Sequence, residues 1–567
     1  MRISVSTLAG LVVAILSFGQ AQAFTATTSE PLTEKISTSI RDCRVGKSFT
    51  APLITWGADM VTIHANGGLK TASGSNFAKA GLDITLKRVD DFSAQLSDYM
   101  SCQTPFLRAT VGMANLAADL TSADPRTAMV AVYQHSWSAG GDALVVTPGI
   151  EKPVDLKGKR IAVQAYGPHV DYLLTVLGDA GLDIGDVEIV WTSDLTGLTN
   201  SSPDTALIEG AADAAMVIIP DALALTSGGN VGTGSEGSVK GAEVLLSTKT
   251  ANRVIADAYY VRSDFLKANP DAVNAFVEAL VDSEREVSAI TRQGGSDAKV
   301  LYALGAEILL DDESAVEDAA GLWTDVETVG AEGNARFFRD PAYQRRFSRL
   351  NETIQGKYIA LGMLKRVSVI AGPPATITAF GQSSGGVAKA RFNEEAVNKT
   401  VADLQAQGAL EDGTLFLFEL NFKPNQNEFD VKIYEDAFKK AVDLAATYGG
   451  ALITVEGHAD PLNYLKKQRA GAGDAALKKI AQSARNLSYN RASAVRAGLI
   501  QLAEAEGLYM DPSQFALLGQ GFSDPLTGMC GQHPCAPKSK EEWLSNMRVV
   551  FRIIKVEAEA SDFELLD

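Results

Sequence analysis

Short apolar segments alternate with amphipathic segments from residue 48 to about residue 365. RIAVQAYG at 160–167 is typical of a strand that enters a turn, and HVDYLLTVLGDAG at 169–181 has apolar side chains at helical spacing before a terminating glycine. DVEIVWTSD at 186–194 predicts the next strand. This alternation is the pattern of an α/β unit, in which helices cover the faces of a sheet.

The chain is too long to fold around a single core. It has 567 residues, and a single hydrophobic core seldom grows beyond about 250–300 residues. The Gly-, Pro-, Ser- and Ala-rich segment that begins at residue 366 predicts a linker over 366–408. A second unit is expected over 409–556, followed by an acidic tail over 557–567.

The second unit has the pattern of an α+β domain. LFLFELNF at 415–422 alternates apolar side chains, as a half-buried strand does. The segment 430–450 has one apolar helical face and ends in two glycines. ALITVEG at 451–457 predicts a strand, LSYNRASAVRAGLIQLA at 487–503 a helix, and MRVVFRII at 547–554 a final strand. The expected order is therefore β-α-β-α-β.

The first residues have the composition of a secretory signal peptide over 1–23. Arg2 precedes an apolar run at 8–18, and Ala21-Gln22-Ala23 is a small-residue cleavage site, so cleavage is expected before Phe24. The apolar run is shorter than the ~20 residues that a membrane-spanning helix needs. The mature protein is therefore expected in the periplasm. A net charge of −18 argues against nucleic acid as a partner.

An exported chain with four cysteines is expected to form two disulfides. We expect Cys43 to pair with Cys102 and Cys530 with Cys535, each within one unit. The segment CGQHPC also contains His533, so a metal site at this loop is an alternative, although two thiols and one imidazole at this spacing are a poor zinc signature. No metal or cofactor is assigned.

The first unit resembles the substrate-binding proteins of ABC importers of the nitrate, sulfonate and taurine type. The stretch from GDALVVTPG to GDVEIV, then ALIEGAADAAMVIIPDALA, carries the resemblance, which covers roughly 45–365. It implies a two-lobed periplasmic-binding-protein fold of type II, with one lobe over about 48–130 plus 255–365 and the other over 131–254. It also implies a small-molecule solute between the lobes and an ABC permease as a partner.

Candidate solute-binding residues follow from this resemblance and from a glycine-containing turn at 165–169 that enters a helix. They are Trp56, Gly112, Gly141, Asp142, Tyr166, Gly167, His169, Pro220 and Asp221. Each has a structural alternative as a core residue, turn or helix cap. The carboxylates of Asp142, Asp194 and Asp221 do not suit an anion, so a cationic or zwitterionic solute remains open.

The second unit resembles the OmpA C-terminal family of peptidoglycan-binding domains. GHAD, ending at Asp460, and LSYNRA, containing Arg491, match that family's motifs. The resemblance implies that Asp460 accepts the ammonium of diaminopimelate in the wall stem peptide. Arg491, one turn into the helix that begins at Leu487, would take its carboxylate. Arg548 matches a second family arginine, with a purely structural role as the alternative.

A basic insert separates the two wall-binding motifs. Its residues 462–486 contain Lys466, Lys467, Arg469, Lys478, Lys479 and Arg485 in an otherwise acidic chain. One interpretation is an amphipathic segment that extends from the domain into solvent. The other is an added contact with anionic wall groups.

Together these features predict a periplasmic solute-binding protein that is anchored non-covalently to peptidoglycan, on the outer-membrane side of the cell wall. The alternative is a wall-anchored sensor or envelope scaffold whose first unit does not serve transport. The sequence contains no HExxH motif or Walker loop, and an enzyme is not expected.

Overall fold

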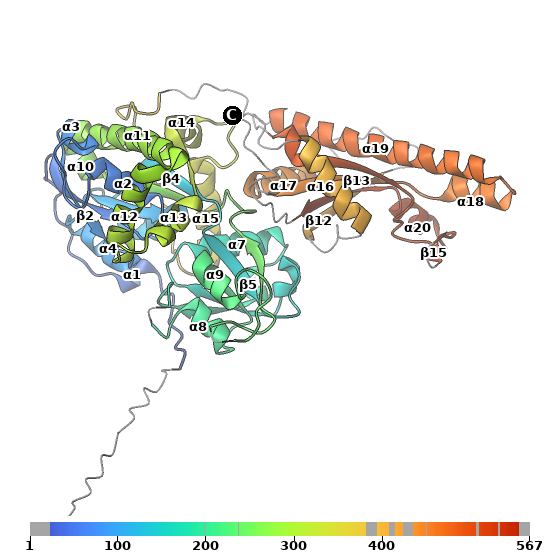
Figure 1. Cartoon of the computed structure of the whole chain (residues 1–567), viewed down its shortest axis with the longest axis horizontal. Helices are drawn as coiled ribbons and strands as arrows, with labels where there is room; N and C mark the ends of the chain where they lie inside the picture. The colour runs from blue at the N-terminus through green and yellow to red at the C-terminus, as the bar shows by residue number, and fades with distance from the viewer. Residues whose placement is uncertain are drawn as a thin grey trace, which may run out of the picture.

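The computed structural model describes 23–381, apart from Leu198 and Glu236, and then 394–407, 414–422, 435–449, 451–505, 510–530 and 533–554. The predicted signal peptide before residue 23 and the acidic tail lie outside these residues. Figure 1 shows two adjacent lobes in blue to yellow and an elongated unit in orange to red. Within the described part of the chain, no helix combines the length and the apolar character that crossing a membrane requires.

The first lobe is built on a four-stranded antiparallel sheet in the order β11-β4-β10-β3. Its strands are β3 (Phe106–Thr110), β4 (Met129–Ser138), β10 (Ala256–Arg262) and β11 (Val326–Thr328), and a parallel pair, β1 (Ser48–Leu53) and β2 (Asp83–Arg88), lies beside them. Its shorter helices are α1 (Leu32–Lys35), α2 (Asp59–Asn66), α3 (Asn76–Lys79), α4 (Phe92–Met100), α5 (Val111–Leu116), α6 (Ala118–Thr121) and α10 (Ser263–Ala268). The later helices are α11 (Pro270–Gln293), α12 (Gly295–Leu310), α13 (Val316–Thr324), α14 (Gly330–Arg339) and α15 (Phe347–Ala360).

Helix α11 illustrates how the sequence specifies these elements. It begins at Pro270, whose fixed φ suits the first helical position and whose missing N–H costs no hydrogen bond there. Val273, Phe276, Val277 and Leu280 then repeat at helical spacing and are fully buried. Tilted and edge-on contacts of the Phe276 ring with Phe106 and Tyr259 extend this core into the first-lobe sheet.

The second lobe is a five-stranded mixed sheet in the order β7-β6-β8-β5-β9. Its strands are β5 (Asp142–Val146), β6 (Arg160–Gln164), β7 (Glu188–Thr192), β8 (Ala214–Ile218) and β9 (Glu243–Ser247), and its helices are α7 (His169–Asp179), α8 (Pro203–Ile208) and α9 (Ile219–Leu225). Strands β6, β7 and β8 run parallel, whereas β5 runs antiparallel to β8.

The boundary between the lobes differs from the expected position at residue 131. Strand β4 continues to Ser138 within the first-lobe sheet, and the second lobe begins at Asp142. The return crossing follows β9, before β10 begins at Ala256. The apolar run of β4 carried no sign of the boundary, because a strand buried on both faces stays apolar throughout.

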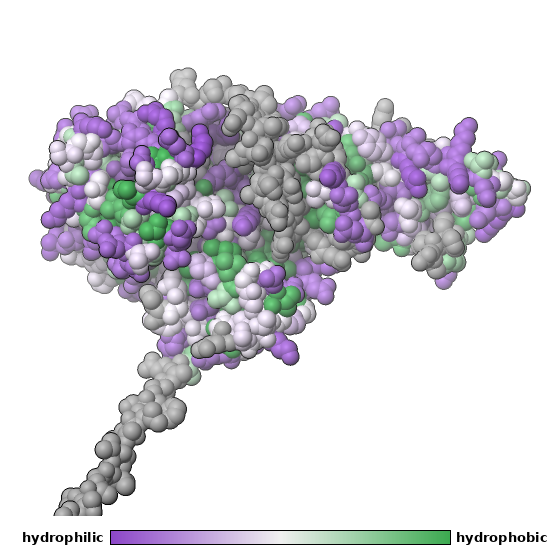
Figure 2. All heavy atoms as spheres, in the orientation of Figure 1, coloured by the Kyte–Doolittle hydropathy of each residue, from purple (hydrophilic) through white to green (hydrophobic). Residues whose placement is uncertain are grey.

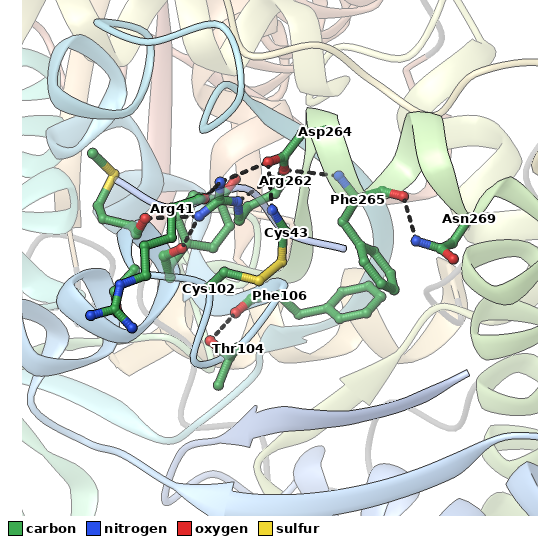
Figure 3. Close-up of a disulfide and its surroundings, with 12 residues drawn as sticks. Arg41, Cys43, Cys102, Thr104, Phe106, Arg262, Asp264, Phe265 and Asn269 are labelled. Atoms are coloured by element: carbon green, nitrogen blue, oxygen red, sulfur yellow. Dashed lines mark hydrogen bonds and ion pairs between the residues drawn. A yellow bond between two sulfur atoms is a disulfide. The ribbon is translucent and has the colours of Figure 1, made fainter. Parts of the chain in front are cut away.

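Both expected disulfides are present. Cys43–Cys102 ties the segment before β1 to the end of α4, and Cys530–Cys535 closes a short loop in the second unit. Figure 3 shows the first bond beside Arg262 and Asp264, where the backbone N–H of Cys43 donates to Asp264 at 3.0 Å. Arg262 also donates to the Arg41 carbonyl at 2.7 Å, so the segment before β1 is hydrogen-bonded to a residue of β10.

A buried group of three charges joins the elements of the first lobe. The guanidinium of Arg108 in β3 contacts Asp59 at the start of α2, at 2.8 Å, and Asp257 in β10, at 3.1 Å. All three side chains are almost completely excluded from solvent. The two carboxylates raise the pKa of Arg108 above its usual range, so the guanidinium stays charged.

The second unit is an α+β layer structure with a sheet in the order β12-β17-β13-β14. Its elements are α16 (Glu394–Gln407), β12 (Thr414–Asn421), α17 (Glu435–Thr447), β13 (Leu452–His458), α18 (Leu462–Arg469), α19 (Asp474–Ala505), β14 (Phe515–Gly521), β15 (Met529–Cys530), β16 (His533–Pro534), α20 (Lys540–Ser545) and β17 (Arg548–Ile554). Strand β14, parallel to β13, was missed in the expected order.

The expected linker is largely structured. Ile377 and Phe380 are buried in the first-lobe core, so the chain up to Gly381 belongs to the two-lobed unit. Helix α16 then buries Val397 and Val401 against Leu452 on one face of the second-unit sheet. Small residues and prolines gave this segment the composition of a linker. Its few apolar side chains are nevertheless buried in the cores of the two flanking units.

Helix α17 and the turn after it dock the second unit onto the two-lobed unit. The hydroxyl of Tyr448 donates to Asp179, at the end of α7 in the second lobe, at 2.9 Å. Asp443 pairs with Arg349 of α15 at 2.5 Å. The carbonyl of Thr447 accepts from the N–H of Arg253 in the return crossing, at 3.3 Å. The second unit therefore contacts both lobes and one of their connections.

We predict that Arg108→Leu destabilises the protein by about 3–5 kcal/mol, because it leaves two buried carboxylates without their cation. Arg44→Leu is the matched control, since Arg44 forms an exposed pair with Asp42 and its loss should change stability by less than about 1 kcal/mol. Chemical denaturation followed by circular dichroism measures both. Equal stability of the two variants would contradict the structural importance of the buried group.

Candidate functional site

Three predicted solute-binding residues lie at one edge of the second-lobe sheet. His169 opens α7 just after β6, and Asp221 lies in the first turn of α9 just after β8. Because β6 and β8 are parallel, their carboxyl ends meet at the same edge. Asp142 begins β5, which is antiparallel to β8, and pairs with Ile218 at the end of β8. The topology therefore brings all three to this edge.

Asp142 and His169 form the centre of this group. Asp142 Oδ1 lies 2.7 Å from His169 Nε2, and Asp142 Oδ2 accepts from the hydroxyl of Ser138 at 2.6 Å. The hydroxyl of Thr248 lies 2.9 Å from that of Ser138, so both crossings between the lobes contribute. The His169 ring is fully buried, and its Nδ1 has no hydrogen-bond partner in the described part of the chain.

The first lobe reaches this edge through Trp56. The indole N–H of Trp56 donates to Ser136 at 3.0 Å, and the Ser136 hydroxyl lies 3.3 Å from Asp257 of the buried charge group. The Trp56 ring lies directly against the backbone of Gly141, where an added Cβ would be 2.6 Å from a ring carbon. Only glycine fits at this position without displacing the ring.

Further buried polar atoms between the lobes have no partner among the described residues. They are Asp171 Oδ1 and the hydroxyls of Tyr172 and Tyr358. Tyr358 of α15 lies across from Gly112 of α5, and Asp171 of α7 contacts the same glycine position. Unpaired buried polar groups each cost about 1–3 kcal/mol, so such a cluster indicates a place where a bound molecule supplies partners.

Burial raises the pKa values of several carboxyl groups around this region. It raises the pKa of Asp221 to about 7, with Asp204 and Asp194 adding to the effect and His169 opposing it. Burial raises the pKa of Asp325, beside Gly140, to about 6, with Lys249 opposing. Burial also raises the pKa of Asp171, against the attraction of Lys357 and Arg345. The region is rich in carboxyl groups whose charge a cation would stabilise.

The structure does not bring every predicted residue to this group. Tyr166 turns to the N-terminal segment, where its hydroxyl donates to the Glu30 carbonyl at 2.6 Å and Lys35 lies over its ring. Pro220 is exposed at the start of α9, and Gly167 lies against Gln164. The anion-binding turn expected at 165–169 is therefore occupied partly by contacts within the chain.

Several residues of the interlobe group were not expected. These are Ser138, Thr248, Asp171, Tyr172, Tyr358 and Asp325. Asp171 and Tyr172 lie within an amphipathic helix, where a polar residue usually faces solvent. No local sequence signal shows whether such a polar residue faces solvent or the other lobe, because the residue opposite it in the fold, Tyr358, lies far along the chain.

The predicted wall-binding pair comes together in the second unit. Arg491 in α19 is about 1% exposed, donates to the His458 carbonyl at 2.9 Å, and lies over the Phe422 ring. Burial lowers the pKa of Arg491, and the charge of Asp460 opposes this shift. Asp460 is partly exposed after β13, and its Oδ1 accepts from the N–H of Leu462 at 2.9 Å.

The expectation that Arg491 lies one turn into its helix is wrong. Helix α19 begins at Asp474 and is continuous to Ala505, so Arg491 lies in its middle. The N–H groups near Leu487 are therefore used within the helix, because only the first four of a helix lack a partner. The close approach of α19 to β13 depends on Gly457, where an added Cβ would lie 1.8 Å from the Ser488 carbonyl.

Two basic side chains complete this region. His458 is buried, and its Nδ1 lies 3.1 Å from the Asp524 carbonyl, which can only accept, so Nδ1 carries the proton. Burial, assisted by Arg548, lowers the pKa of His458 to about 3, so the ring is neutral and its unpartnered Nε2 is an acceptor. Arg548 is held by Glu419 at 3.3 Å and Asp524 at 3.5 Å, as expected for a structural cation near the sheet edge.

The structure favours the disulfide at CGQHPC over the metal alternative, because both thiols are used in the Cys530–Cys535 bond. Across the described residues, no group of three or more His, Cys, Asp or Glu side chains has the arrangement of a metal site.

The two-lobed unit thus has two sheets, two chain crossings between them and a polar group where the lobes meet. Residues 72–288 match a family model described as NMT1/THI5 like. The match falls within the two-lobed unit and includes the whole second lobe.

Particular proteins are similar over the same unit. A taurine-binding periplasmic protein of Escherichia coli strain K12 is 35% identical over 145 residues, which are 25% of this chain and 40% of that protein. The chain thus spans less than half the length of this curated relative. The aliphatic sulphonate binding protein SsuA of Escherichia coli aligns at 14% identity and a TM-score of 0.41, covering 57% of this chain and 90% of that one. The desulfurization enzyme DszB aligns at 18% identity and a TM-score of 0.38, covering 60% and 99%.

We predict that Gly141→Ala displaces the Trp56 ring and destabilises the protein by about 1–3 kcal/mol through overpacking. Gly178→Ala is the control, because an added Cβ in that helix meets no neighbouring atom. The double variant Gly141→Ala/Trp56→Leu should recover part of the loss, since the clashing ring is absent. Chemical denaturation measures the cycle, and additive effects of the two substitutions would contradict the contact.

Proposed function

We propose that this chain is a periplasmic solute-binding protein of the ABC-importer type whose C-terminal unit binds peptidoglycan. The observation that carries the first part is the interlobe group around Asp142 and His169. Its side chains come from both lobes and from both crossings, and several of its buried polar atoms lack partners. Sites of this kind hold small polar molecules between convergent strand ends and helix starts.

The chemistry of the group favours a solute with an ammonium group. Asp142, Asp171, Asp221 and Asp325 lie around the interlobe region. Lys249 interacts with Asp325, and Lys357 and Arg345 interact with Asp171. A zwitterion places its ammonium beside carboxylates and its anionic group beside cations or helix N–H groups. Similarity to a taurine-binding protein supports the same solute class, a small amino sulfonate.

We predict that taurine binds about tenfold more tightly at about pH 8 than at about pH 6, because Asp221 has a pKa of about 7 and is protonated at the lower pH. A protonated Asp221 loses its attraction for the solute ammonium. Asp221→Asn should bind weakly at both pH values and lose the pH dependence. Glu243→Gln, on the exposed start of β9, is the control. Isothermal titration calorimetry measures the affinities, and tighter binding at the lower pH would contradict the assignment.

For the second part, the proximity of Asp460 and Arg491 supports recognition of diaminopimelate. An anion and a guanidinium lie at one end of the sheet, and the neutral His458 offers an unpartnered acceptor beside them. An amino-acid end group needs an acceptor for its ammonium and a fork of donors for its carboxylate. The OmpA-type motifs around these residues point to the same ligand.

We predict that Asp460→Ala abolishes co-sedimentation of the mature protein with isolated sacculi. Arg491→Lys should weaken it by about tenfold, because lysine keeps the charge but loses the planar fork. Asp403→Ala, an exposed acidic residue on α16, is the control for a lost negative charge. Circular dichroism checks that each variant is folded. Full binding by folded Asp460→Ala would refute the wall-binding proposal while leaving the solute-binding proposal intact.

A further inference from the structure

The insert between the wall-binding motifs forms a helical hairpin that projects from the second unit. Helix α18 begins at Leu462, and a short turn at 470–473 leads into α19. Leu465 and Leu477 are buried where the two helices pack together. In Figure 1, α18 and the start of α19 lie at the end of the molecule farthest from the two lobes. We call residues 462–486 the basic hairpin.

The basic hairpin carries positive charge that the protein leaves uncompensated. It contains six Lys or Arg residues and one acidic residue, Asp474, in a chain with a net charge of −18. All six basic residues are exposed, and none forms an ion pair within the described part of the chain. Elsewhere many exposed basic residues do pair with carboxylates, such as Lys365 with Glu34 at 2.7 Å. The hairpin therefore suits an external anionic partner.

The surface of the hairpin favours a hydrated polymer over a membrane. Its turn is Ala-Gly-Ala-Gly, without a large apolar side chain to enter lipid. Leu465 and Leu477 are used inside the hairpin, and Tyr464 packs on Phe522 at its base. Figure 2 shows hydrophilic residues prominent along this end of the molecule. A helix that lies in a membrane surface instead needs an exposed apolar face.

The hairpin is joined rigidly to the candidate wall-binding site. Asp460 precedes it directly and caps its first turn through the N–H of Leu462. At the other end, α19 runs without interruption from Lys478 to Arg491. A polymer held at Asp460 and Arg491 therefore passes close to the exposed lysines.

We propose that the basic hairpin is a second contact with peptidoglycan, in which its lysines and arginines attract the carboxylates of neighbouring stem peptides. This inference rests on the proposed wall binding by the Asp460–Arg491 site. The site recognises one peptide end in detail, and the hairpin adds a less specific attraction along the same polymer. Such an attraction between exposed charges weakens as salt shortens the screening length.

The test compares three forms of the mature full-length protein in co-sedimentation with isolated sacculi. The hairpin variant combines Lys466→Gln, Lys467→Gln, Lys478→Gln and Lys479→Gln, and glutamine keeps the helix propensity of lysine. The control variant combines the same change at four exposed lysines of the two-lobed unit: Lys47, Lys70, Lys267 and Lys299. Apparent affinities are measured from about 50 mM to about 300 mM NaCl, which spans the range where screening changes most.

We expect the hairpin variant to bind about tenfold more weakly than the wild type at low salt and to lose most of the salt dependence. The control variant should behave as the wild type. Equal affinity and equal salt dependence of all three forms would overturn the inference. Asp460→Ala separates the two proposals: if it keeps wild-type binding at high salt, the wall-binding site itself is wrong. Co-flotation of the wild type, but not the hairpin variant, with vesicles of equal parts phosphatidylglycerol and phosphatidylethanolamine would assign the hairpin to a membrane and overturn the wall assignment.

Discussion

The buried contact of Arg108 with Asp59 and Asp257 is the interaction on which the two-lobed unit depends. It fixes the start of α2 and the strand β10 to β3, at the end of the first-lobe sheet, in a region without solvent. From Asp257 the polar contacts continue through Ser136 to the indole of Trp56. The charged group thus determines where Trp56 lies, and Trp56 lies against the crossing at Gly141. The stability of the first lobe and the geometry of the interlobe site therefore both depend on this buried group of three charges.

A second set of charges connects the interlobe region to the C-terminal unit. Arg345, partly buried just before α15, interacts electrostatically with Asp171 between the lobes, Asp179 at the end of α7, and Asp443 of α17. Burial raises the pKa of Asp179 to about 6, and the hydroxyl of Tyr448 opposes that shift. The Tyr448–Asp179 hydrogen bond and the Arg349–Asp443 ion pair add direct contacts to these charges. The two units are therefore physically coupled rather than joined by a passive linker.

The sequence pattern predicted the elements with strong periodicity and missed the features that depend on distant residues. The alternation in the first unit indicated an α/β fold, and the strands at 415–422 and 451–457 were placed correctly to within a residue. The lobe boundary was misplaced because β4 is apolar on both sides of it. The predicted linker was too long because Ile377 and Val397 are isolated apolar residues whose packing partners are distant in the sequence. The start of α19 was misplaced because a charged helix that projects into solvent has no apolar stripe to announce it.

The candidate site residues likewise include some that the sequence could predict and some that it could not. Asp142, Asp460 and Arg491 were named through the resemblance to known families, and His169 through the local glycine-containing turn at 165–169. Asp171 and Tyr358 could not be predicted, because their role arises only when α7 and α15 face each other across the lobes. The burial of Arg491 was also unforeseen, and it has a mechanistic consequence. Arg491 is about 1% exposed and Asp460 is partly exposed, so under the proposed wall binding Asp460 is the group that an approaching peptide end meets first. The ammonium of the peptide end would then orient it toward the deeper guanidinium.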